Sequence, residues 1–367
     1  MIVPSGWKQQ KLGVVAELQR GFDLPSQKRI NGDIPIISSG GISGYHNEEK
    51  VKAPGIVTGR YGSIGNVFYI QENFWPLNTS LWVKDFYGND TKFIYFLLSN
   101  FDFKKFSGKT GVPGVNRNDL HAVKVYVPPL PEQQKIAKIL STWDKAISTT
   151  EALIANSKQQ KKALMQQLLT GKKRLLDNSG KVFEGEWEEF KLGEISYITT
   201  GNSNREDSSL DAEYSFFDRS EDIRTSSRFL FDGEAVIVAG EGQDFIPKHF
   251  IGKFDLHQRT YAIMDFKSSV GKFIFYYIGY FRHYFLAQAV GSTVKSLRLP
   301  MFQKMPINLP SFEEQQRIAS VLTNADKEIA LLEQQLTDLK QEKKALMQQL
   351  LTGKRRVKID ESEAALA

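Results

Sequence analysis

The chain has 367 residues, 41% of them hydrophobic and 25% charged, with a net charge of +6 and no cysteine. The lack of cysteine excludes disulfides, thiolate metal sites and cysteine nucleophiles, and it suits a reducing cytoplasm. A chain of this length can bury two sizeable cores. The positive net charge favours a nucleic-acid partner, although many basic proteins bind none.

No segment has the pattern of a signal peptide or a membrane span. Residues 1–7 lack the charged and apolar regions of a signal peptide. The most apolar stretch, residues 273–286, contains Arg282 and His283 and is too short to cross a bilayer. We therefore expect a soluble, cytoplasmic protein.

The two halves of the chain repeat one another. Residues 161–172 recur letter for letter as residues 343–354, 182 positions later. The repeat continues at offsets of 182 or 180, and its other matches pair residues 132–137 with 314–319, Asp144 with Asp326, and Trp7 with Trp187. Each half therefore consists of a globular portion of about 130 residues followed by a long helix, which indicates one module written twice.

The helices of the two copies are nearly the same, whereas the globular portions differ strongly. A recent duplication whose ends were copied last would leave the same pattern. The simpler interpretation is that the helices do one job twice, while the globular portions do two versions of a related job.

Both long helices are amphipathic. Their apolar residues alternate at spacings of four and three for about five heptads, which is the pattern of a coiled coil. Ser311 and Glu314 form a candidate capping box at the start of the second helix, and Gly171 and Gly353 close the two helices. The predicted seam consists of Ile136, Leu140, Trp143, Ile147, Ile154, Leu164 and Leu168 in the first helix, and Ile318, Leu322, Ile329, Leu332, Leu336, Leu339, Leu346 and Leu350 in the second.

Each helix is expected to span about 38 residues, or about 55–60 Å. An amphipathic helix of that length needs a partner, and the obvious partner is its own copy. Because the chain passes through a globular portion between the helices, an antiparallel pair is the economical arrangement. We therefore predict an α+β fold in which two mixed, mostly β domains are joined by two long helices that form an antiparallel coiled coil, with an internal pseudo-two-fold repeat.

Short β-type runs bounded by Gly, Asn, Ser and Pro predict the strands of the globular portions. The runs are residues 34–37, 55–58, 67–70 and 81–83 in the first portion, and residues 235–238 and 261–264 in the second. One helix rich in aromatic residues is predicted in each portion, at residues 91–106 and 270–288. We interpret the aromatic rows as core and not as base-stacking surfaces.

Polar, glycine-rich loops between these runs provide the candidate DNA-binding residues. Glycine lets a backbone approach DNA closely, and polar or basic side chains pair with phosphates or base edges. Most loops of this composition are solvated turns, which is the competing interpretation. The candidates are Ser38, Ser39, Arg60, Tyr61, Ser63, Lys109, Thr110, Asn116 and Arg117 in the first portion, and Gln243, Lys248, Lys295 and Arg298 in the second.

No catalytic motif is found. Residues 107–110 look like the end of a phosphate-binding loop, but Phe103 stands where that loop requires glycine. The five histidines show no metal-ligand spacing, and no Ser/His/Asp elbow occurs. The sequence indicates a non-catalytic chain without a metal or cofactor of its own.

Two strings carry a family resemblance. Residues 128–137, Pro-Pro-Leu-Pro-Glu-Gln-Gln-Lys-Ile-Ala, with the long helix that ends in Leu-Leu-Thr-Gly-Lys, resemble the conserved regions of specificity subunits of type I restriction-modification enzymes. Residues 309–319 and the second helix match again. Residues 59–65, Gly-Arg-Tyr-Gly-Ser-Ile-Gly, resemble a recurrent target-recognition string of that family, but residues 239–244 of the second portion depart from it.

The resemblance implies two target-recognition domains, each of which reads one half of a bipartite, asymmetric site in double-stranded DNA. The helices would set the gap between the half-sites and dock two methyltransferase subunits. S-adenosylmethionine, ATP and Mg²⁺ are then expected in the methyltransferase and the restriction (translocase and endonuclease) subunits of a bacterial or archaeal cell. The implied segments are a first recognition domain at 1–130, a spacer helix at 131–172, a linker at 173–185, a second recognition domain at 186–311, a second spacer helix at 312–353 and a tail at 354–367.

Two other classes of function stay open. A coiled-coil interaction scaffold without sequence-specific DNA binding predicts no strong salt dependence of any DNA affinity. A stand-alone enzyme needs a catalytic constellation, which the sequence lacks.

Overall fold

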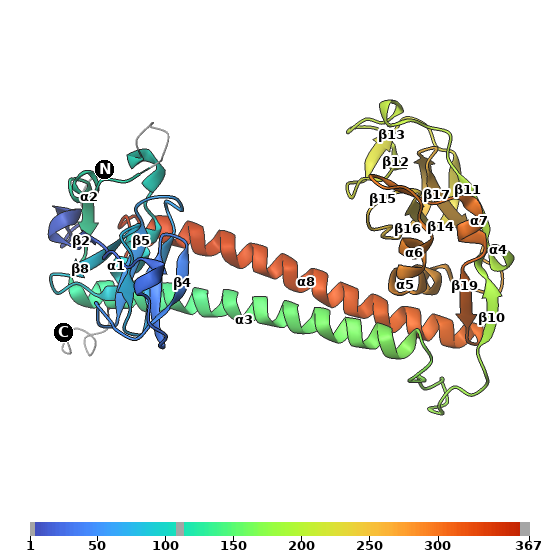
Figure 1. Cartoon of the computed structure of the whole chain (residues 1–367), viewed down its shortest axis with the longest axis horizontal. Helices are drawn as coiled ribbons and strands as arrows, with labels where there is room; N and C mark the ends of the chain where they lie inside the picture. Colours follow the sequence, from blue (N-terminus) through green and yellow to red (C-terminus); the bar gives the residue numbers. More distant parts are fainter. Residues whose placement is uncertain (1–3, 108–113, 360–367) are drawn as a thin grey trace. The chain divides into compact units, whose positions relative to one another are not determined.

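The computed structural model describes residues 4–107 and 114–359, and the chain divides into two units (Figure 1). Unit 1 consists of Met1–Glu151 with Gln334–Ala367, and unit 2 of Ala152–Glu333. Two 39-residue helices, α3 (Leu130–Leu168) and α8 (Phe312–Leu350), contribute to both units. Each unit therefore contains the start of one long helix and the end of the other.

Unit 1 has a β portion made of three small sheets. Their strand orders are β1-β9, β2-β8-β5-β6 and β4-β3-β7. Because β1 pairs with β9, the first and last strands of this globular portion lie together, and Lys8 faces Val127. The elements are β1 (Lys8–Lys11), β2 (Glu17–Arg20), β3 (Ile34–Ser38), β4 (Gly41–His46), β5 (Gly55–Gly59), β6 (Val67–Ile70), β7 (Trp75–Pro76), β8 (Ser80–Asp85), α1 (Thr91–Ser99), α2 (Arg117–His121) and β9 (Lys124–Val127).

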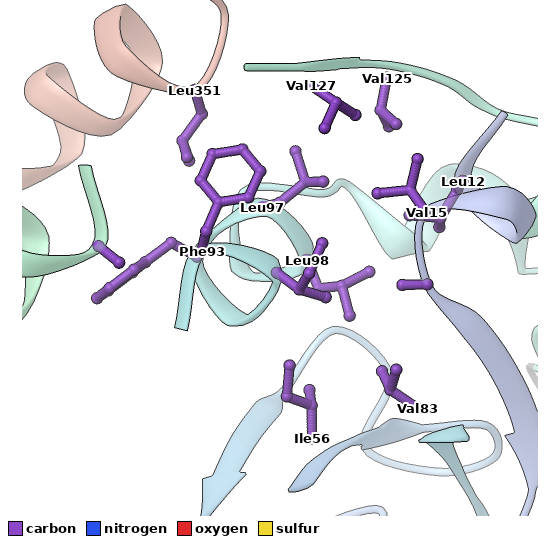
Figure 2. Packing of buried hydrophobic residues seen from close by; sticks show 14 of the residues in the cluster. Leu12, Val15, Ile56, Val83, Phe93, Leu97, Leu98, Val125, Val127 and Leu351 are labelled. Atoms are coloured by element: carbon purple, nitrogen blue, oxygen red, sulfur yellow. The ribbon is translucent and has the colours of Figure 1, made fainter. Parts of the chain in front are cut away.

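The core of unit 1 is built around the apolar helix α1. Figure 2 shows Phe93, Leu97 and Leu98 of α1 surrounded by aliphatic side chains from the strands and by Leu351, which follows α8. Residues of both long helices complete this cluster, among them Ile136 of α3. Burial of these side chains at about 25 cal/mol per Å² is the main force that ties the long helices to the sheets.

Unit 2 repeats this plan with a larger sheet. Its strand orders are β10-β19, β11-β17-β14-β16-β12-β13 and β15-β18, and Glu188 faces Leu309 in the pair that closes the unit. The elements are β10 (Glu188–Lys191), α4 (Leu192–Ile195), β11 (Tyr197–Thr200), β12 (Tyr214–Phe217), β13 (Arg224–Ser226), β14 (Phe231–Ala239), β15 (Glu241–Gly242), β16 (Lys248–Leu256), β17 (Thr260–Met264), α5 (Gly271–Tyr280), α6 (His283–Gln288), β18 (Lys295–Ser296), α7 (Leu299–Gln303) and β19 (Pro306–Leu309). The mixed α+β fold and its internal repeat are thus as predicted.

The six β-type runs of the sequence all lie in strands, but both globular helices are shorter than predicted. Helix α1 ends at Ser99 with Asn100 as its C-cap, and Phe103–Phe106 forms a separate 3-10 turn. In unit 2 the predicted helix is split between α5 and α6 at Phe281. The chain changes direction at each break, but Phe103 and Phe285 beyond the breaks are still buried in the core. The apolar pattern of the sequence therefore continues although the helix does not.

The Glu-Gln-Gln string at the start of each long helix has a structural function. The Gln133 side chain accepts from the Asp90 amide at 2.9 Å and donates to the Pro128 carbonyl at 3.0 Å. Gln315 makes the corresponding bonds to the Val270 amide, 2.9 Å, and the Pro310 carbonyl, 2.9 Å. Each glutamine therefore joins the start of a long helix to the start of the aromatic helix of its unit.

The glutamates of the same string bind arginines that follow the other helix. Glu132 accepts from Arg356 at 2.7 Å in unit 1, and Glu314 accepts from Arg174 at 2.6 Å in unit 2. The capping box predicted at Ser311 is therefore only half formed. The Ser311 hydroxyl accepts from the Glu314 amide at 3.3 Å, while the Glu314 carboxylate is occupied by Arg174.

Within each unit the two helix segments run antiparallel. In unit 1, Asp144 and Glu151 of α3 form ion pairs with Lys343 and Lys340 of α8, so residue numbers rise on one helix as they fall on the other. In unit 2 the pairs are Lys158 with Glu333 and Lys161 with Asp326. Every predicted seam residue is buried or half-buried: Ile136, Leu140, Trp143, Ile147, Ile154, Leu164, Leu168, Ile318, Leu322, Ile329, Leu332, Leu336, Leu339, Leu346 and Leu350.

The predicted glycines terminate both helices, three residues after the last helical residues Leu168 and Leu350. Gly171 and Gly353 have φ of +68° and +70°, which is the left-handed conformation that glycine adopts without strain. The Lys173 amide then donates to the Gln167 carbonyl at 3.1 Å, and the Arg355 amide to that of Gln349 at 3.1 Å.

Candidate nucleic-acid interface

The turn between β5 and β6 of unit 1 packs against the turn between β3 and β4. A Cβ on Gly59 would lie 2.1 Å from the Ser63 carbonyl oxygen and 3.3 Å from the Ser39 Cβ. Only glycine allows this approach. These two turns therefore lie side by side. Their candidate residues, Ser38 and Ser39 in one and Arg60 and Ser63 in the other, belong to one surface.

Tyr61 connects this surface to the loop before α2. It forms an antiparallel bridge with Gly114, and a Cβ on Gly114 would lie 2.3 Å from the Tyr61 ring. The Arg60 guanidinium lies over the same ring, 4.5 Å from its centre. This cation–π contact and a long hydrogen bond from Nη1 to the Asn78 carbonyl, 3.5 Å, orient the guanidinium, and its other N–H groups can bind a ligand.

A cleft of about 930 Å³ opens between β2, the Arg60 turn and the start of α2. Among its described lining residues are three arginines, Arg20, Arg60 and Arg117, and one carboxylate, Asp23. Asp23 is paired with Arg20 at 2.9 Å. The excess of positive charge makes this cleft suited to an anionic polymer.

Helix α2 presents Asn116 and Arg117 to the cleft. Asn116 is its N-cap and accepts from the Asn118 amide at 3.0 Å. At the other end of α2, the His121 Nε2 accepts from the Leu18 amide at 2.9 Å, which fixes α2 to β2. Burial, and then the Arg117 charge, lower the pKa of His121, so the imidazole stays neutral and keeps its acceptor nitrogen.

The structure thus brings together seven of the nine candidates of the first portion. Lys109 and Thr110 lie outside the described residues. Arg20 and Asp23 were missed because they adjoin an ordinary strand, and no loop composition marks them.

In unit 2 the candidates are arranged differently. Gln243 donates to the Thr293 carbonyl at 3.2 Å, and Lys295 faces Gly242 across the β15–β18 pair, so these two lie in neighbouring loops. Arg298 is exposed at the N-cap of α7. Lys248 instead donates to the carbonyls of Ser220, 2.5 Å, and Glu221, 2.9 Å. Burial lowers the pKa of Lys248, which is consistent with a loop-holding role.

Sequence reasoning also missed a second basic cluster in unit 2. A cleft of about 270 Å³ is lined by Arg205, Arg219 and Arg259 together with the carboxylates of Asp218 and Glu241. These arginines come from three separate loops; an Asn adjoins Arg205 and a Ser adjoins Arg219, whereas neither residue type adjoins Arg259. The cluster is a product of the tertiary structure.

Two further features bear on the chemistry of the chain. Across residues 4–107 and 114–359, no group of three or more His, Asp or Glu side chains could hold a metal ion. Over the same residues, no helix combines the length and apolarity that a bilayer crossing requires.

Comparison with known proteins agrees with the repeated architecture. The family model "type I restriction modification DNA specificity domain" matches twice, at residues 4–158 and 184–341. The MjaVIII type I specificity subunit of Methanocaldococcus jannaschii is 27% identical over 294 residues, which are 68% of this chain and 66% of that protein.

Solved structures have the same fold. The type I S subunit from M. genitalium superposes with a TM-score of 0.68 at 16% identity, covering 94% of this chain and 96% of that one. A structure described for complex assembly and conformational transition of a type I system superposes at 0.57, also at 16% identity, covering 96% and 99%. The chain belongs to the family of type I restriction-modification DNA specificity domains, of which it contains two copies.

Proposed function

We propose that the chain is the sequence-specific DNA-binding subunit of a type I restriction-modification enzyme and is itself non-catalytic. Residues 1–130 and 186–311 act as target-recognition domains, and each reads one half of a bipartite, asymmetric site. Residues 131–172 and 312–353 act as spacer helices in an antiparallel coiled coil. They set the unread gap and dock two methyltransferase subunits, which the restriction subunits then join. Residues 173–185 act as a linker and residues 354–367 as a tail.

The observation that carries this proposal is a contrast between the two units. The ion pairs of Asp144 with Lys343 and of Glu151 with Lys340 in unit 1 have counterparts in unit 2, Asp326 with Lys161 and Glu333 with Lys158, which is expected if both ends hold the same partner. The clefts beside α2 and α7 differ, which is expected if they read different sequences. The positions of Arg20 and Arg117 in the first cleft correspond to Thr200 and Leu299 in a cleft of about 610 Å³ in unit 2.

The assignment of catalysis to partner subunits has a chemical basis in the clefts. The cleft of unit 1 contains arginine and amide side chains, and the cleft beside α7 in unit 2 contains hydroxyl and amide side chains; groups of these kinds bind phosphates and base edges. S-adenosylmethionine, ATP and Mg²⁺ accordingly belong to the methyltransferase and restriction subunits.

Binding to double-stranded DNA separates the candidate functions. The chain, alone and with its methyltransferase subunit, is mixed with random and genomic duplexes at two salt concentrations. A specificity subunit binds a defined subset of duplexes, with an affinity that falls steeply with salt. A coiled-coil scaffold binds no DNA selectively, and that result would reject the proposal.

Arg60→Ala and Arg117→Ala test the cleft of unit 1. Loss of a phosphate contact weakens binding to all sequences. It also lowers by about one the slope of the logarithm of the binding constant against the logarithm of the salt concentration. Loss of a base contact costs about 1–3 kcal/mol on the cognate site alone. Lys84→Ala is the matched control, because Lys84 is an exposed cation near the far end of β8, paired with Glu17 at 3.3 Å. Unchanged binding in both arginine variants would show that the cleft is not the interface.

Exchanging residues 1–130 for those of a relative tests modularity. One half of the recognised sequence should change and the other should persist, because each portion has its own core. A change in both halves would show that the portions do not read DNA independently.

Heptad insertions test the spacer. One heptad added to each helix, after Ile154 and at the facing level of α8, keeps the seam register and adds about 10 Å. The gap should lengthen by about three base pairs, since a turn of 10–10.5 base pairs spans about 34–36 Å. An unchanged gap with full methylation activity would show that the helices do not measure the distance.

A further inference from the structure

The backbone around Arg60 in unit 1 has a counterpart in unit 2. The Arg60 amide donates to the Thr79 carbonyl at 2.9 Å. At the corresponding place, the Gly240 amide donates to the Arg259 carbonyl at 2.8 Å. In unit 1 an arginine, Arg60, is therefore the donor of this hydrogen bond, and in unit 2 an arginine, Arg259, is its acceptor. Both units thus have an arginine side chain at this place, although only Arg60 lies in the string, residues 59–65, that resembles the family.

The turn that carries Arg259, between β16 and β17 in Figure 1, is held by its neighbours. The Arg259 amide donates to the His257 Nδ1 at 3.1 Å, and the Thr260 amide donates to the His257 carbonyl at 2.9 Å. A Cβ on Gly240 would lie 2.6 Å from the Arg259 carbonyl oxygen, so this approach requires glycine. Burial lowers the pKa of His257, which keeps the imidazole neutral and its Nδ1 free to accept.

Glu241 orients the Arg259 side chain. The Arg259 Nη1 donates to the Glu241 Oε1 at 2.5 Å, and the Arg259 side chain remains 62% exposed while Glu241 is 20% exposed. One edge of the guanidinium is thus bound, and much of the side chain faces solvent. The paired carboxylate also offsets the positive charge, which weakens attraction to phosphates in general and leaves directional hydrogen bonding as the main asset of Arg259.

A guanine edge in the major groove matches such a donor. Guanine presents two adjacent acceptors there, N7 and O6, and a bidentate arginine is the commonest specific contact to them. Fixing the guanidinium before binding lowers the entropy lost on contact. Arg219, which lines the same cleft, supplies positive charge beside it for the DNA backbone, whereas Arg205 is paired with Asp218 at 3.6 Å.

We propose that Arg259, positioned by Glu241, is a specificity-determining residue of unit 2 that reads one guanine of its half-site. This inference rests on the proposed function and assigns to unit 2 a base contact outside the family-like string.

Host-genome methylation, read by long-read sequencing, tests this in the intact enzyme with the chain replaced by variants. Arg259→Ala should make one G·C position degenerate in one half of the site, with discrimination falling about 5–150-fold, the equivalent of about 1–3 kcal/mol. Arg259→Gln should shift the preference at that position toward adenine, because glutamine pairs with adenine N6 and N7. The other half of the site should not change.

Two variants complete the design. Glu241→Gln frees the charge of Arg259, so binding to random duplexes should rise while discrimination at that position falls. Lys267→Ala is the control, because Lys267 is an exposed cation beyond the far end of β17. Its methylation pattern should equal that of the natural chain.

Three results would overturn the inference. Equal weakening on all duplexes by Arg259→Ala, with full recovery in Arg259→Lys, would make Arg259 a phosphate contact. If Arg259→Ala leaves its half-site unchanged while Arg60→Ala alters the other half, Arg259 does not read a base, although the proposed function still holds. No sequence preference in the natural chain would reject the proposed function and this inference together.

Discussion

Lys343 of α8 forms an ion pair with Asp144 of α3, and its ammonium group lies 5.3 Å from the centre of the Phe96 ring. Lys161 and Asp326 repeat this pair in unit 2, where the ammonium lies 5.5 Å from the Tyr276 ring. Both lysines interrupt an apolar heptad seam. Their position is explained by this contact, since the aliphatic stem covers the aromatic helix while the charge is paired.

We predict that Lys343→Ala destabilises unit 1 by about 1–3 kcal/mol, between the values for exposed and buried pairs. The Lys343 side chain is only 17% exposed, so its loss leaves Asp144 unpaired beside an aromatic cluster. The midpoint of urea unfolding measures the effect. Lys340→Ala, three residues earlier, is the control. It breaks an exposed pair with Glu151 and should cost less than about 1 kcal/mol. Equal effects would mean that the Lys343 contact is no stronger than a surface pair.

Two equivalent tryptophans differ in their hydrogen bonding. The Trp7 Nε1 donates to Glu132 at 2.9 Å, whereas the Nε1 of Trp187 is buried and has no hydrogen-bond partner among the described residues. Trp7→Phe should therefore cost about 1–2 kcal/mol more than Trp187→Phe, because only the first breaks a hydrogen bond to a buried carboxylate. Calorimetric unfolding of the two variants measures the difference, and a larger loss in Trp187→Phe would contradict it.

Gly114→Ala should reduce DNA binding without unfolding unit 1. The new methyl group would overlap the Tyr61 ring and displace the Arg60 turn from the cleft. Binding to cognate duplex should fall at least about tenfold, equivalent to 1.4 kcal/mol. The circular dichroism spectrum should not change. Unaltered binding would show that the position of Tyr61 does not matter for recognition.

His121 predicts a loss of stability in acid. Its pKa is lowered in the folded chain, so below the unfolded value of about 6.5 the unfolded chain takes up more protons. The contribution of His121 to the free energy of unfolding is fully present above that pH, and it declines as the pH falls toward the pKa of the folded chain. His121→Gln, which does not titrate, should reduce the loss in urea midpoint between pH 7.5 and 5.5. An identical loss in both proteins would show that His121 does not contribute.

The repeat, the two long helices, six of the strands and the family resemblance were accessible from the sequence. Periodicity and turn residues act locally, and an exact twelve-residue recurrence requires no structure to interpret. The loops of unit 1 were also accessible, because Gly59, Gly62 and Gly65 mark the Arg60 turn in a single string.

Pairings between distant residues required the tertiary structure. The inward direction of Lys248, the occupation of Glu314 by Arg174 and the pairing of Arg259 with Glu241 each depend on which loops the sheet brings together. Composition marks a residue as polar, but it does not state whether its charge is paired or which way its side chain points. For this chain, the sequence alone determined the module and its duplication. Folding decided which arginines line each cleft, because each cleft is built from several loops that are separate in the sequence.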